Sequence, residues 1–501
     1  MTGILLAILY TAFFIFLIRK LSFFRVNGMP PNSMVFVFLL KILAGTALWF
    51  VYSRLYTDRS TADIFKYFDD GKAIYKLLFE DPSAYFKIIL GIPDPDLDRY
   101  LDHTTRHWNM SYVQGLYNET RTIIRFNALL DIFSFGNYHV HTVFICFLSL
   151  AGLNGIYRSF LPFLQEVKRI LFACVFLLPS VLFWGSGVLK EGLILFSMGL
   201  LVYQFFQFIK EGITIKRTVL LLVFSFLLAL SKLYMLFILI PAFAAHVWIV
   251  KTNFKMPLLK YTSVFAGLFL IVLLVPKFNL PFKLMDKQRQ SIYMASGGAF
   301  LGDLNNKFIY IRPEVKDRVI RSKERPDYGK IVHGVPYVSW YFDDYTDSTY
   351  VPASTDTATY LIYYDLERAG SMIDIPLVYP SYPSLLRNSP VALLNSAFRP
   401  HLLEAKNPLM ILSAIESICI MAFLIVCLLF FSKKFSQNHL VYFCLTVTAL
   451  LFILIGLTTP VLGSIVRYKV PVLPFFLIAF LFIPDKEKLA AKLPFLRKIP
   501  G

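Results

Sequence analysis

An acidic cluster follows the second long apolar stretch of the chain, within the sequence ADIFKYFDDGKAIY. On a helix, Asp63, Tyr67 and Asp70 fall on one face by the i, i+4, i+7 spacing, whereas Asp69 turns away. A carboxylate beside an apolar surface can hold a raised pKa and act as a general base towards an acceptor hydroxyl. The alternative interpretation is a solvated acidic helix end that neighbouring lysines balance.

Basic residues before apolar stretches form a second group of candidates. Lys190 and Glu191 open one such stretch, in PSVLFWGSGVLKEGLILF. A helix start attracts anions and an adjacent lysine adds a positive charge, so this pair is a candidate seat for a lipid phosphate. The alternative is a Lys–Glu pair that marks the membrane interface, with Glu191 favoured by the helix dipole.

Two arginine motifs precede late apolar stretches, AFRPHLLEAKNP and GSIVRYKVPVLP. A guanidinium binds phosphate through two hydrogen bonds, whereas the alternative for a single arginine is snorkelling to lipid headgroups. The candidate catalytic residues are thus Asp63, Asp69 and Asp70, and the candidate substrate-binding residues are Tyr67, Lys190, Glu191, Arg399, His401, Arg467, Tyr468 and Lys469.

Other signals for cofactor chemistry are weak. His103 and His107 are spaced i, i+4 and could share a divalent metal with Asp102, but the pair lacks a third defined ligand, so we expect no metal and no cofactor. All five cysteines lie in apolar segments, and the chain has no phosphate-cradling glycine loop. Lys232 interrupts a long apolar run, which makes it a functional candidate because charge is costly in lipid.

The elements that position these residues are membrane-spanning helices. Of the 501 residues, 57% are hydrophobic and only 16% charged, against roughly 25% charged in a soluble domain. Long apolar runs recur, and the short alternating segments of a barrel are absent. We therefore predict an all-α polytopic membrane protein with about eleven spans, near residues 3–18, 33–52, 138–157, 169–185, 188–208, 217–231, 233–250, 258–276, 408–431, 439–459 and 468–483.

The distribution of charge predicts the orientation. The net charge is +18, and outside residues 53–137 and 278–406 there are 25 basic but only 6 acidic residues. This basic excess lies after every odd-numbered span, which places those connections and the C-terminus in the cytoplasm and the N-terminus outside. No basic stripe interleaved with aromatics is present, so nucleic acid is excluded as the partner.

Five regions follow from this topology. They are the first two spans (1–52), an outer loop with the acidic motif and amphipathic helices (53–137), a central transmembrane bundle (138–277), a large outer loop domain of irregular or mixed structure (278–406), and the C-terminal spans with a basic cytoplasmic tail (407–501). Both large loops lie on the outer face. The function is therefore expected on that face.

Four short motifs, in this order and on one side of the membrane, resemble those of bacterial polysaccharide-locus membrane proteins. They are Asp63 to Tyr67, Pro179 to Glu191, Phe398 to Pro400 and Arg467 to Pro474. Such proteins resemble the C-superfamily (GT-C) glycosyltransferases, which transfer sugars from polyprenyl-phosphate donors on the outer face. The resemblance covers most of the membrane core but little of the second loop. Here the acidic loop follows the second span rather than the first, as one extra N-terminal helix would explain.

The resemblance implies a GT-C-like fold in the bacterial inner membrane. It implies a transferase that takes a sugar from a polyprenyl-phosphate-linked donor at the periplasmic face. The acceptor would be a cell-envelope glycan, lipid or protein. It implies that Asp63, or failing that Asp69 or Asp70, is the catalytic carboxylate. Lys190, Arg399 and Arg467 would bind the lipid phosphate. The alternatives are an O-antigen or exopolysaccharide polymerase, and a flippase or transporter for lipid-linked sugar without chemistry.

Overall fold

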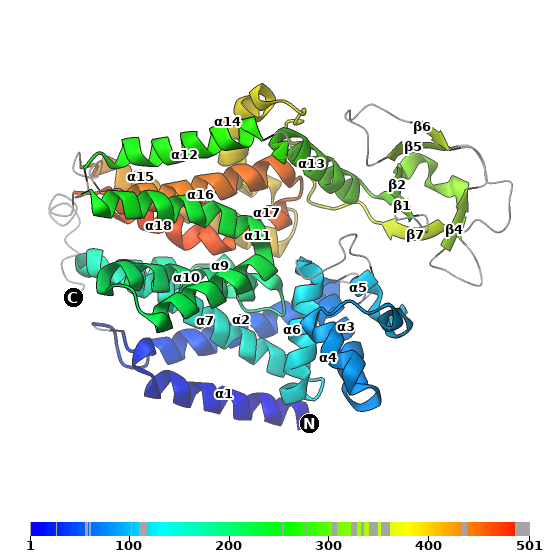
Figure 1. Ribbon diagram of the computed structural model, residues 1–501, viewed down its shortest axis with the longest axis horizontal. Helices are drawn as coiled ribbons and strands as arrows, with labels where there is room; N and C mark the ends of the chain where they lie inside the picture. The colour runs from blue at the N-terminus through cyan, green and yellow to red at the C-terminus, as the bar shows by residue number, and fades with distance from the viewer. Residues whose placement is uncertain are drawn as a thin grey trace. The chain divides into compact units, whose positions relative to one another are not determined.

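Long apolar helices dominate the computed structural model (Figure 1), which describes residues 2–26, 28–55, 59, 62–101, 103–109, 118–252, 255–275, 278–302, 308–321, 328–331, 335–339, 349–351, 361–432 and 438–485. Among these residues, nine helical stretches are long and apolar enough to cross a membrane. They are α1 (Thr2–Lys20), α2 (Ser33–Leu55), α7 (Tyr138–Phe160), α10 (Lys190–Glu211), α11 (Ile215–Lys251), α12 (Pro257–Leu274), α15 (Pro408–Leu429), α16 (His439–Thr458) and the stretch Leu462–Leu481, which comprises α17 (Leu462–Tyr468), the 3-10 turn η11 (Val470–Val472) and α18 (Leu473–Leu481).

These helices satisfy their own backbone hydrogen bonds, which is the condition for crossing lipid. Their exposed surfaces are apolar: on α1, Leu5 and Ile8 are 60% and 59% exposed. An apolar surface of this kind faces lipid rather than water. The prediction of a multi-pass helical membrane protein is confirmed.

Nine stretches differ from the eleven predicted spans at two places. Residues 169–185 form two short helices, α8 (Lys168–Phe176) and α9 (Pro179–Trp184), because Leu178 precedes a proline and adopts an extended backbone with ψ 124°. The predicted spans 217–231 and 233–250 are joined in α11, so the number of spans stays a prediction.

Helix α11 consists of two arms that meet at Lys232, whose backbone is non-helical (φ −159°, ψ 89°). Both arms pack along α10: Phe196 contacts Phe224 of the first arm, and Phe205 stacks on Phe243 of the second at 3.9 Å between ring centroids. The arms thus fold back on each other along α10. The two arms correspond to the predicted stretches 217–231 and 233–250, which also divide at Lys232.

The chain divides into two compact units. The first comprises Met1–Val264, Cys419–Thr448 and Val470–Gly501, and the second comprises Phe265–Ile418 and Ala449–Lys469. In the first unit, α7 and α10 cross closely at two glycines: a Cβ on Gly152 would lie 2.0 Å from the carbonyl oxygen of Leu195, and one on Gly199 would lie 2.1 Å from that of Gly152. Small residues at such a crossing let two membrane helices approach.

The described residues of the first long loop, 53–137, form a compact helical layer of the first unit. Its elements are α3 (Asp63–Glu80), α4 (Pro82–Leu90), the 3-10 turns η3 (Pro95–Tyr100) and η4 (His103–Thr105), α5 (Arg106–Asn109) and α6 (Glu119–Ser134). Figure 1 shows α3 to α6 gathered at one end of the bundle formed by α1, α2, α7 and α10. The sequence predicts amphipathic helices in residues 53–137, and α3 and α6 are such helices.

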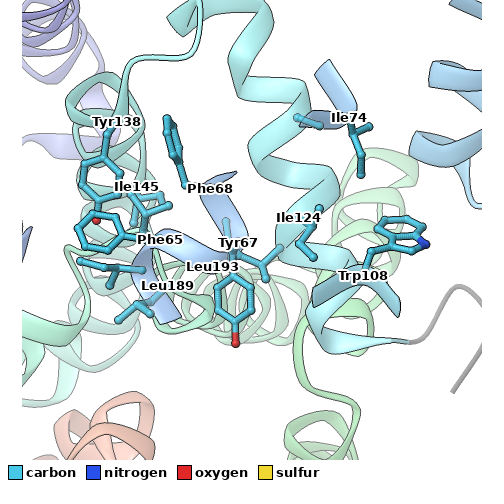
Figure 2. Close-up of a cluster of buried hydrophobic side chains, with 14 of the residues drawn as sticks. Phe65, Tyr67, Phe68, Ile74, Trp108, Ile124, Tyr138, Ile145, Leu189 and Leu193 are labelled. Atoms are coloured by element: carbon cyan, nitrogen blue, oxygen red, sulfur yellow. The ribbon is translucent and has the colours of Figure 1, made fainter. Parts of the chain in front are cut away.

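An apolar cluster joins this layer to the spans (Figure 2). Phe65 and Phe68 of α3 contact the ring of Tyr138 at the start of α7, at 5.7 and 5.3 Å between centroids. Leu189 and Leu193, around the start of α10, belong to the same cluster. The apolar faces of the loop helices therefore pack against protein.

A buried polar group fixes α6 to α7. The Nε2 atom of His141 lies 2.8 Å from a carboxylate oxygen of Asp131, and its Nδ1 atom lies 2.8 Å from the amide oxygen of Asn127. The Ser134 hydroxyl donates to the same Asp131 oxygen at 2.7 Å. All four side chains are buried. Such a network requires a defined geometry, so it fixes the orientation of the loop layer.

The second unit contains the described residues of the second long loop, 278–406. Helix α13 (Leu280–Ser296) leads into an antiparallel sheet of seven strands in the order β3-β4-β7-β1-β2-β5-β6, and α14 (Tyr382–Phe398) follows it. The strands are β1 (Gly298–Gly302), β2 (Phe308–Ile311), β3 (Val319–Arg321), β4 (Tyr328–Ile331), β5 (Val335–Ser339), β6 (Thr349–Val351) and β7 (Leu361–Leu366). The sequence predicts irregular or mixed structure in residues 278–406, and the strands described there lie outside the long apolar helices.

Candidate functional site

The three candidate catalytic carboxylates all lie on α3, but they point into different surroundings. Asp63 is in the first turn of the helix and is paired with Lys66, with 3.3 Å between Nζ and a carboxylate oxygen. Asp69 pairs with Arg59, which donates from Nε and Nη2 at 2.7 and 2.8 Å. As the helical spacing predicts, Asp69 faces away from Asp63 and Tyr67. It lies in an exposed ion pair.

Asp70 is buried, with 2% of the residue exposed. One carboxylate oxygen accepts hydrogen bonds from the backbone N–H groups of His107 and Trp108, both at 2.9 Å. Burial raises the pKa of Asp70 to about 7, although the two hydrogen bonds oppose the shift. The side chain therefore ties α3 to α5. Its buried position is poorly suited to meeting an acceptor hydroxyl.

Asp63 and Tyr67 are one helical turn apart and share the face of α3 that reaches the start of α10. The Lys190 ammonium lies over the Tyr67 ring, 5.3 Å from its centroid, and donates a hydrogen bond to the Thr120 hydroxyl at 3.2 Å. Figure 2 shows the Tyr67 hydroxyl directed away from the packed apolar cluster. Lys190 and Tyr67, two of the predicted substrate-binding residues, are therefore brought together beside Asp63.

A second lysine joins this group from α11. Lys232 Nζ lies 3.0 Å from a carboxylate oxygen of Glu119, and Lys190 Nζ lies 3.7 Å from the same oxygen. Both lysine side chains are largely buried, at 13% and 12% exposure, whereas the Glu119 side chain is 36% exposed. Two cations thus share one carboxylate. We name Lys190, Lys232, Glu119, Thr120 and Tyr67 the lysine cluster.

Two further features support the start of α10. Glu191 is buried in the first turn of the helix, where the helix dipole favours a carboxylate. In the preceding turn, the carbonyl oxygen of Gly185 accepts a hydrogen bond at 3.1 Å from Lys41, a fully buried lysine of α2. A buried lysine in a membrane helix is costly unless it has a function, and this one fixes the turn that leads to Lys190.

Next to the lysine cluster, α6 carries two arginines that pack on one tryptophan. The guanidinium groups of Arg121 and Arg125 each lie 4.9 Å from the centre of the Trp108 ring. Arg125 also donates from Nε to the carbonyl oxygen of Ile88 at 2.8 Å. Burial, and the nearby charge of Arg121, lower the pKa of Arg125 to about 10. The N-terminal half of α6 thus carries two arginines and lies beside Lys190 and Lys232.

The remaining candidates belong to the second unit. The Arg399 guanidinium pairs with Glu404, with 2.9 Å from Nε to a carboxylate oxygen, and the other Glu404 oxygen accepts from the backbone N–H of His401. Lys469 is buried and donates to the Arg399 carbonyl oxygen at 3.0 Å. The Arg467 guanidinium lies 5.8 Å from the ring centre of Tyr468. Each of these predicted residues is held within its own unit.

The structure thus brings the predicted residues into two groups: Asp63, Tyr67, Lys190 and Glu191 in the first unit, and Arg399, His401, Arg467, Tyr468 and Lys469 in the second. Sequence reasoning missed Glu119 and Thr120. Their signal is the sequence Asn-Glu-Thr before an apolar repeat, since the Asn118 side chain caps α6 by accepting from the backbone N–H of Thr120. His107 is described but Asp102 is not, so the metal hypothesis for this segment stays untested.

The apolar helical stretches define this chain as a multi-pass helical membrane protein, and the lysine cluster lies beside two of them, α10 and α11. Comparison with protein-family models, with curated proteins and with solved structures finds no match. A functional conclusion therefore rests on the residues of the lysine cluster and the acidic segment beside it.

Proposed function

We propose that this protein is a membrane glycosyltransferase that takes a sugar from a polyprenyl-phosphate donor at the outer face of the bacterial inner membrane. The N-terminus is outside and the C-terminus cytoplasmic in this proposal, as the distribution of lysine and arginine favours. The acceptor is a hydroxyl group of a cell-envelope glycan, lipid or protein.

One observation carries the proposal: Lys190 lies over Tyr67, one helical turn from Asp63, at the start of a membrane helix. A phosphate attached to a lipid chain has its charge at the membrane surface and its chain among apolar helices. Lys190 suits such a ligand, because its ammonium lies at the N-terminal end of α10 and the rest of its side chain is largely buried. Asp63 supplies a carboxylate on the neighbouring helix.

The proposed reaction uses these two charges in opposite roles. The Asp63 carboxylate accepts the proton of the acceptor hydroxyl, whose oxygen forms a bond to the anomeric carbon of the sugar. The bond between that carbon and the phosphate oxygen breaks, and polyprenyl phosphate leaves with the electron pair. Lys190 stabilises the negative charge that develops on the departing phosphate, the kind of contribution that usually dominates such catalysis.

Tyr67 and the buried anchors position these groups. The Tyr67 ring holds the Lys190 ammonium by a cation–π contact, worth about 0.5–2 kcal/mol depending on exposure. Asp70 and the Asp131–His141 pair fix α3 and α6, respectively, within the loop layer. Asp69 has no chemical role in this proposal, because it pairs with Arg59 on another face of α3.

The test is transfer by the purified full-length protein in lipid nanodiscs. Polyprenyl-phosphate sugars of several kinds are supplied with envelope glycan acceptors, and release of polyprenyl phosphate is measured. We expect release by the wild type and a loss of about 100-fold or more for Asp63→Asn, the range that removal of a general base gives.

Asp69→Asn is the matched control, since it removes one carboxylate from the same helix but from the exposed pair with Arg59. It should retain nearly full activity. Full transfer by the triple variant Asp63→Asn, Asp69→Asn, Asp70→Asn would refute the mechanism. A ladder of long products would instead identify a polymerase, and movement of donor across the bilayer without release of polyprenyl phosphate would identify a carrier.

A further inference from the structure

Helix α14 of the second unit presents an apolar face that the described residues leave exposed. Leu386 and Leu394 on this face are 66% and 53% exposed. The spacing i, i+4, i+8 relates the exposed positions in two adjacent rows, which places them on one side of the helix. The charge on this face comes from Arg387. The exposed positions within the helix are Pro383, Leu386, Arg387, Pro390, Val391 and Leu394.

The opposite face of α14 packs on a membrane helix of the same unit. The Ser396 hydroxyl donates a hydrogen bond to the carbonyl oxygen of Phe452 in α16 at 2.8 Å. A Cβ on Gly456 of α16 would lie 2.0 Å from the carbonyl oxygen of Ala392, so the two helices approach as closely as a glycine allows. The orientation of α14 is therefore fixed, with its apolar exposed face turned away from α16.

The contacts of α14 lie within the spans rather than beyond their ends. The Tyr382 ring at the start of α14 lies 5.3 Å from the ring of Phe269 in α12, between centroids. Phe269 precedes the last residue of α12 by five residues, about 8 Å of helix, and Phe452 precedes the last residue of α16 by six, about 9 Å. A helix that lies along a membrane surface buries its apolar face to about this depth, roughly 5–10 Å.

Apolar exposure continues along the chain from α14 into a membrane span. The 3-10 turn η9 (Leu402–Glu404) follows α14, and its Leu403 is fully exposed. Helix α15 begins at Pro408, and Leu412 in its second turn is also exposed. Because α15 is apolar over its length, its exposed leucine faces lipid. Lipid that covers α15 is therefore in place to cover η9 and α14 as well.

We propose that α14 and η9 lie in the surface of the lipid bilayer, with Leu386 and Leu394 among the acyl chains and Arg387 at the headgroup phosphates. A long arginine side chain reaches from an apolar helix face to the phosphate layer, and anionic headgroups attract its charge. Part of the second long loop is thus a membrane-binding surface that does not cross the bilayer. This contact with bulk lipid is independent of the proposed transferase activity.

The test measures what surrounds α14 in the full-length protein in nanodiscs. Cys419, which is exposed, is first replaced by serine, because the other four cysteines are buried. A nitroxide is then attached to Leu386→Cys or Leu394→Cys. Its collisions with oxygen, which dissolves in lipid, and with a water-soluble nickel chelate, which lipid excludes, are measured by power-saturation electron paramagnetic resonance.

The matched control is Glu314→Cys, at an exposed residue of the strand-containing part of the same unit. We expect the ratio of oxygen to nickel collisions to be several-fold higher at both α14 positions than at the control. A ratio equal to that of the control would place α14 in water and overturn the proposal. Exclusion of both reagents would show that protein covers this face, such as a second copy of the chain, and would overturn it equally.

The unsubstituted protein gives a second measurement, with a phospholipid that carries a photoreactive diazirine in its acyl chain. Peptides from α14 should carry the lipid adduct, as peptides from α15 do. Labelling of α15 without labelling of α14 would contradict the proposal.

The role of Arg387 is tested in nanodiscs that contain phosphatidylglycerol. Arg387→Glu places a negative charge beside the headgroup phosphates and should lower the collision ratio at Leu394→Cys several-fold, whereas Arg387→Lys should leave it nearly unchanged. An unchanged ratio with Arg387→Glu would show that this side chain does not lie at the phosphates.

Discussion

Two arginines of the second unit and two lysines of the first unit have different carboxylate surroundings. In the second unit, Arg399 has a carboxylate of its own in Glu404, and Arg289 of α13 has one in Asp286 at 3.0 Å. In the first unit, Lys190 and Lys232 share Glu119. In the proposed mechanism Lys190, which also lies over Tyr67, is the principal cation, and Arg399 is not.

The largest effect is expected for Lys190. Lys190→Gln removes the charge beside Tyr67 and should lower transfer of sugar about 100-fold, because a preorganised cation stabilises the departing phosphate. Arg399→Gln should lower it by much less, since Glu404 already neutralises that guanidinium. Initial rates with a polyprenyl-phosphate sugar measure both. Equal losses would remove the distinction between the two units.

The next effect concerns the pH dependence of stability. Burial raises the pKa of Asp70 to about 7 in the folded protein, above the roughly 3.9 of an unfolded chain, so the native state holds the proton more tightly. The free energy of unfolding should therefore fall as pH rises from about 4 to about 7, by ~2–3 kcal/mol between pH 5 and 8. Asp70→Asn keeps an oxygen acceptor for the two backbone N–H groups and should flatten this decline in thermal unfolding measurements.

Asp81 provides the internal control for that prediction. Its pKa is lowered, chiefly by the hydrogen bond from the Ala84 backbone N–H, with a further contribution from Tyr100. Stability from such a group is lost as pH falls through the folded-state pKa, which is the opposite direction. Asp81→Asn should therefore leave the decline between pH 5 and 8 in place. A decline of the same size in Asp70→Asn would show that Asp70 does not cause it.

A smaller effect is expected at the ion pair of Arg399 and Glu404 in the second unit. Glu404→Gln removes the ion pair with Arg399 and weakens the acceptor for the His401 N–H, and should lower stability by about 1 kcal/mol. Thermal unfolding of the purified protein measures the change. An unchanged unfolding temperature would show that the pair of Arg399 and Glu404 contributes nothing to stability.

The smallest effect is expected for the exposed pair of Arg59 and Asp69. Asp69→Asn should change stability by less than about 1 kcal/mol, because exposed ion pairs contribute little. Unfolding at low and high salt should show that most of this difference disappears at high salt, since exposed charges are screened. A loss of several kcal/mol would mean that the pair is structurally essential.

Several features of the fold could be predicted from the amino-acid pattern alone. The apolar runs predict the long helices, and the boundary predicted between residues 217–231 and 233–250 coincides with the kink of α11 at Lys232. The i, i+4, i+7 spacing predicts that Asp69 turns away from Tyr67. These are local properties of helices. The break before Pro179 also follows from a local rule, although the apolar character of residues 169–185 suggested one continuous span.

Local patterns do not give the partners of a charge. Glu119 and Asp63 look alike as acidic residues at helix starts, but Asp63 pairs with Lys66 of its own helix, whereas Glu119 meets lysines from two other helices. Asp70 and Asp69 are neighbours in the chain, yet one is buried against the backbone of α5 and the other is exposed beside Arg59. Local patterns also do not predict the sheet of the second loop, because its strand order joins segments that are far apart in the sequence.

By itself, the sequence determined that this chain is a helical membrane protein with its acidic segment just beyond a span, because hydrophobic length and charge distribution act locally on insertion into lipid. The tertiary structure alone decided which carboxylate is buried, which is exposed, and which is shared by two lysines. The physical reason is that burial and pairing depend on helices that meet in space. For that reason Lys190, first a candidate by its position before a span, gained its neighbours Tyr67, Lys232 and Glu119 only in the fold.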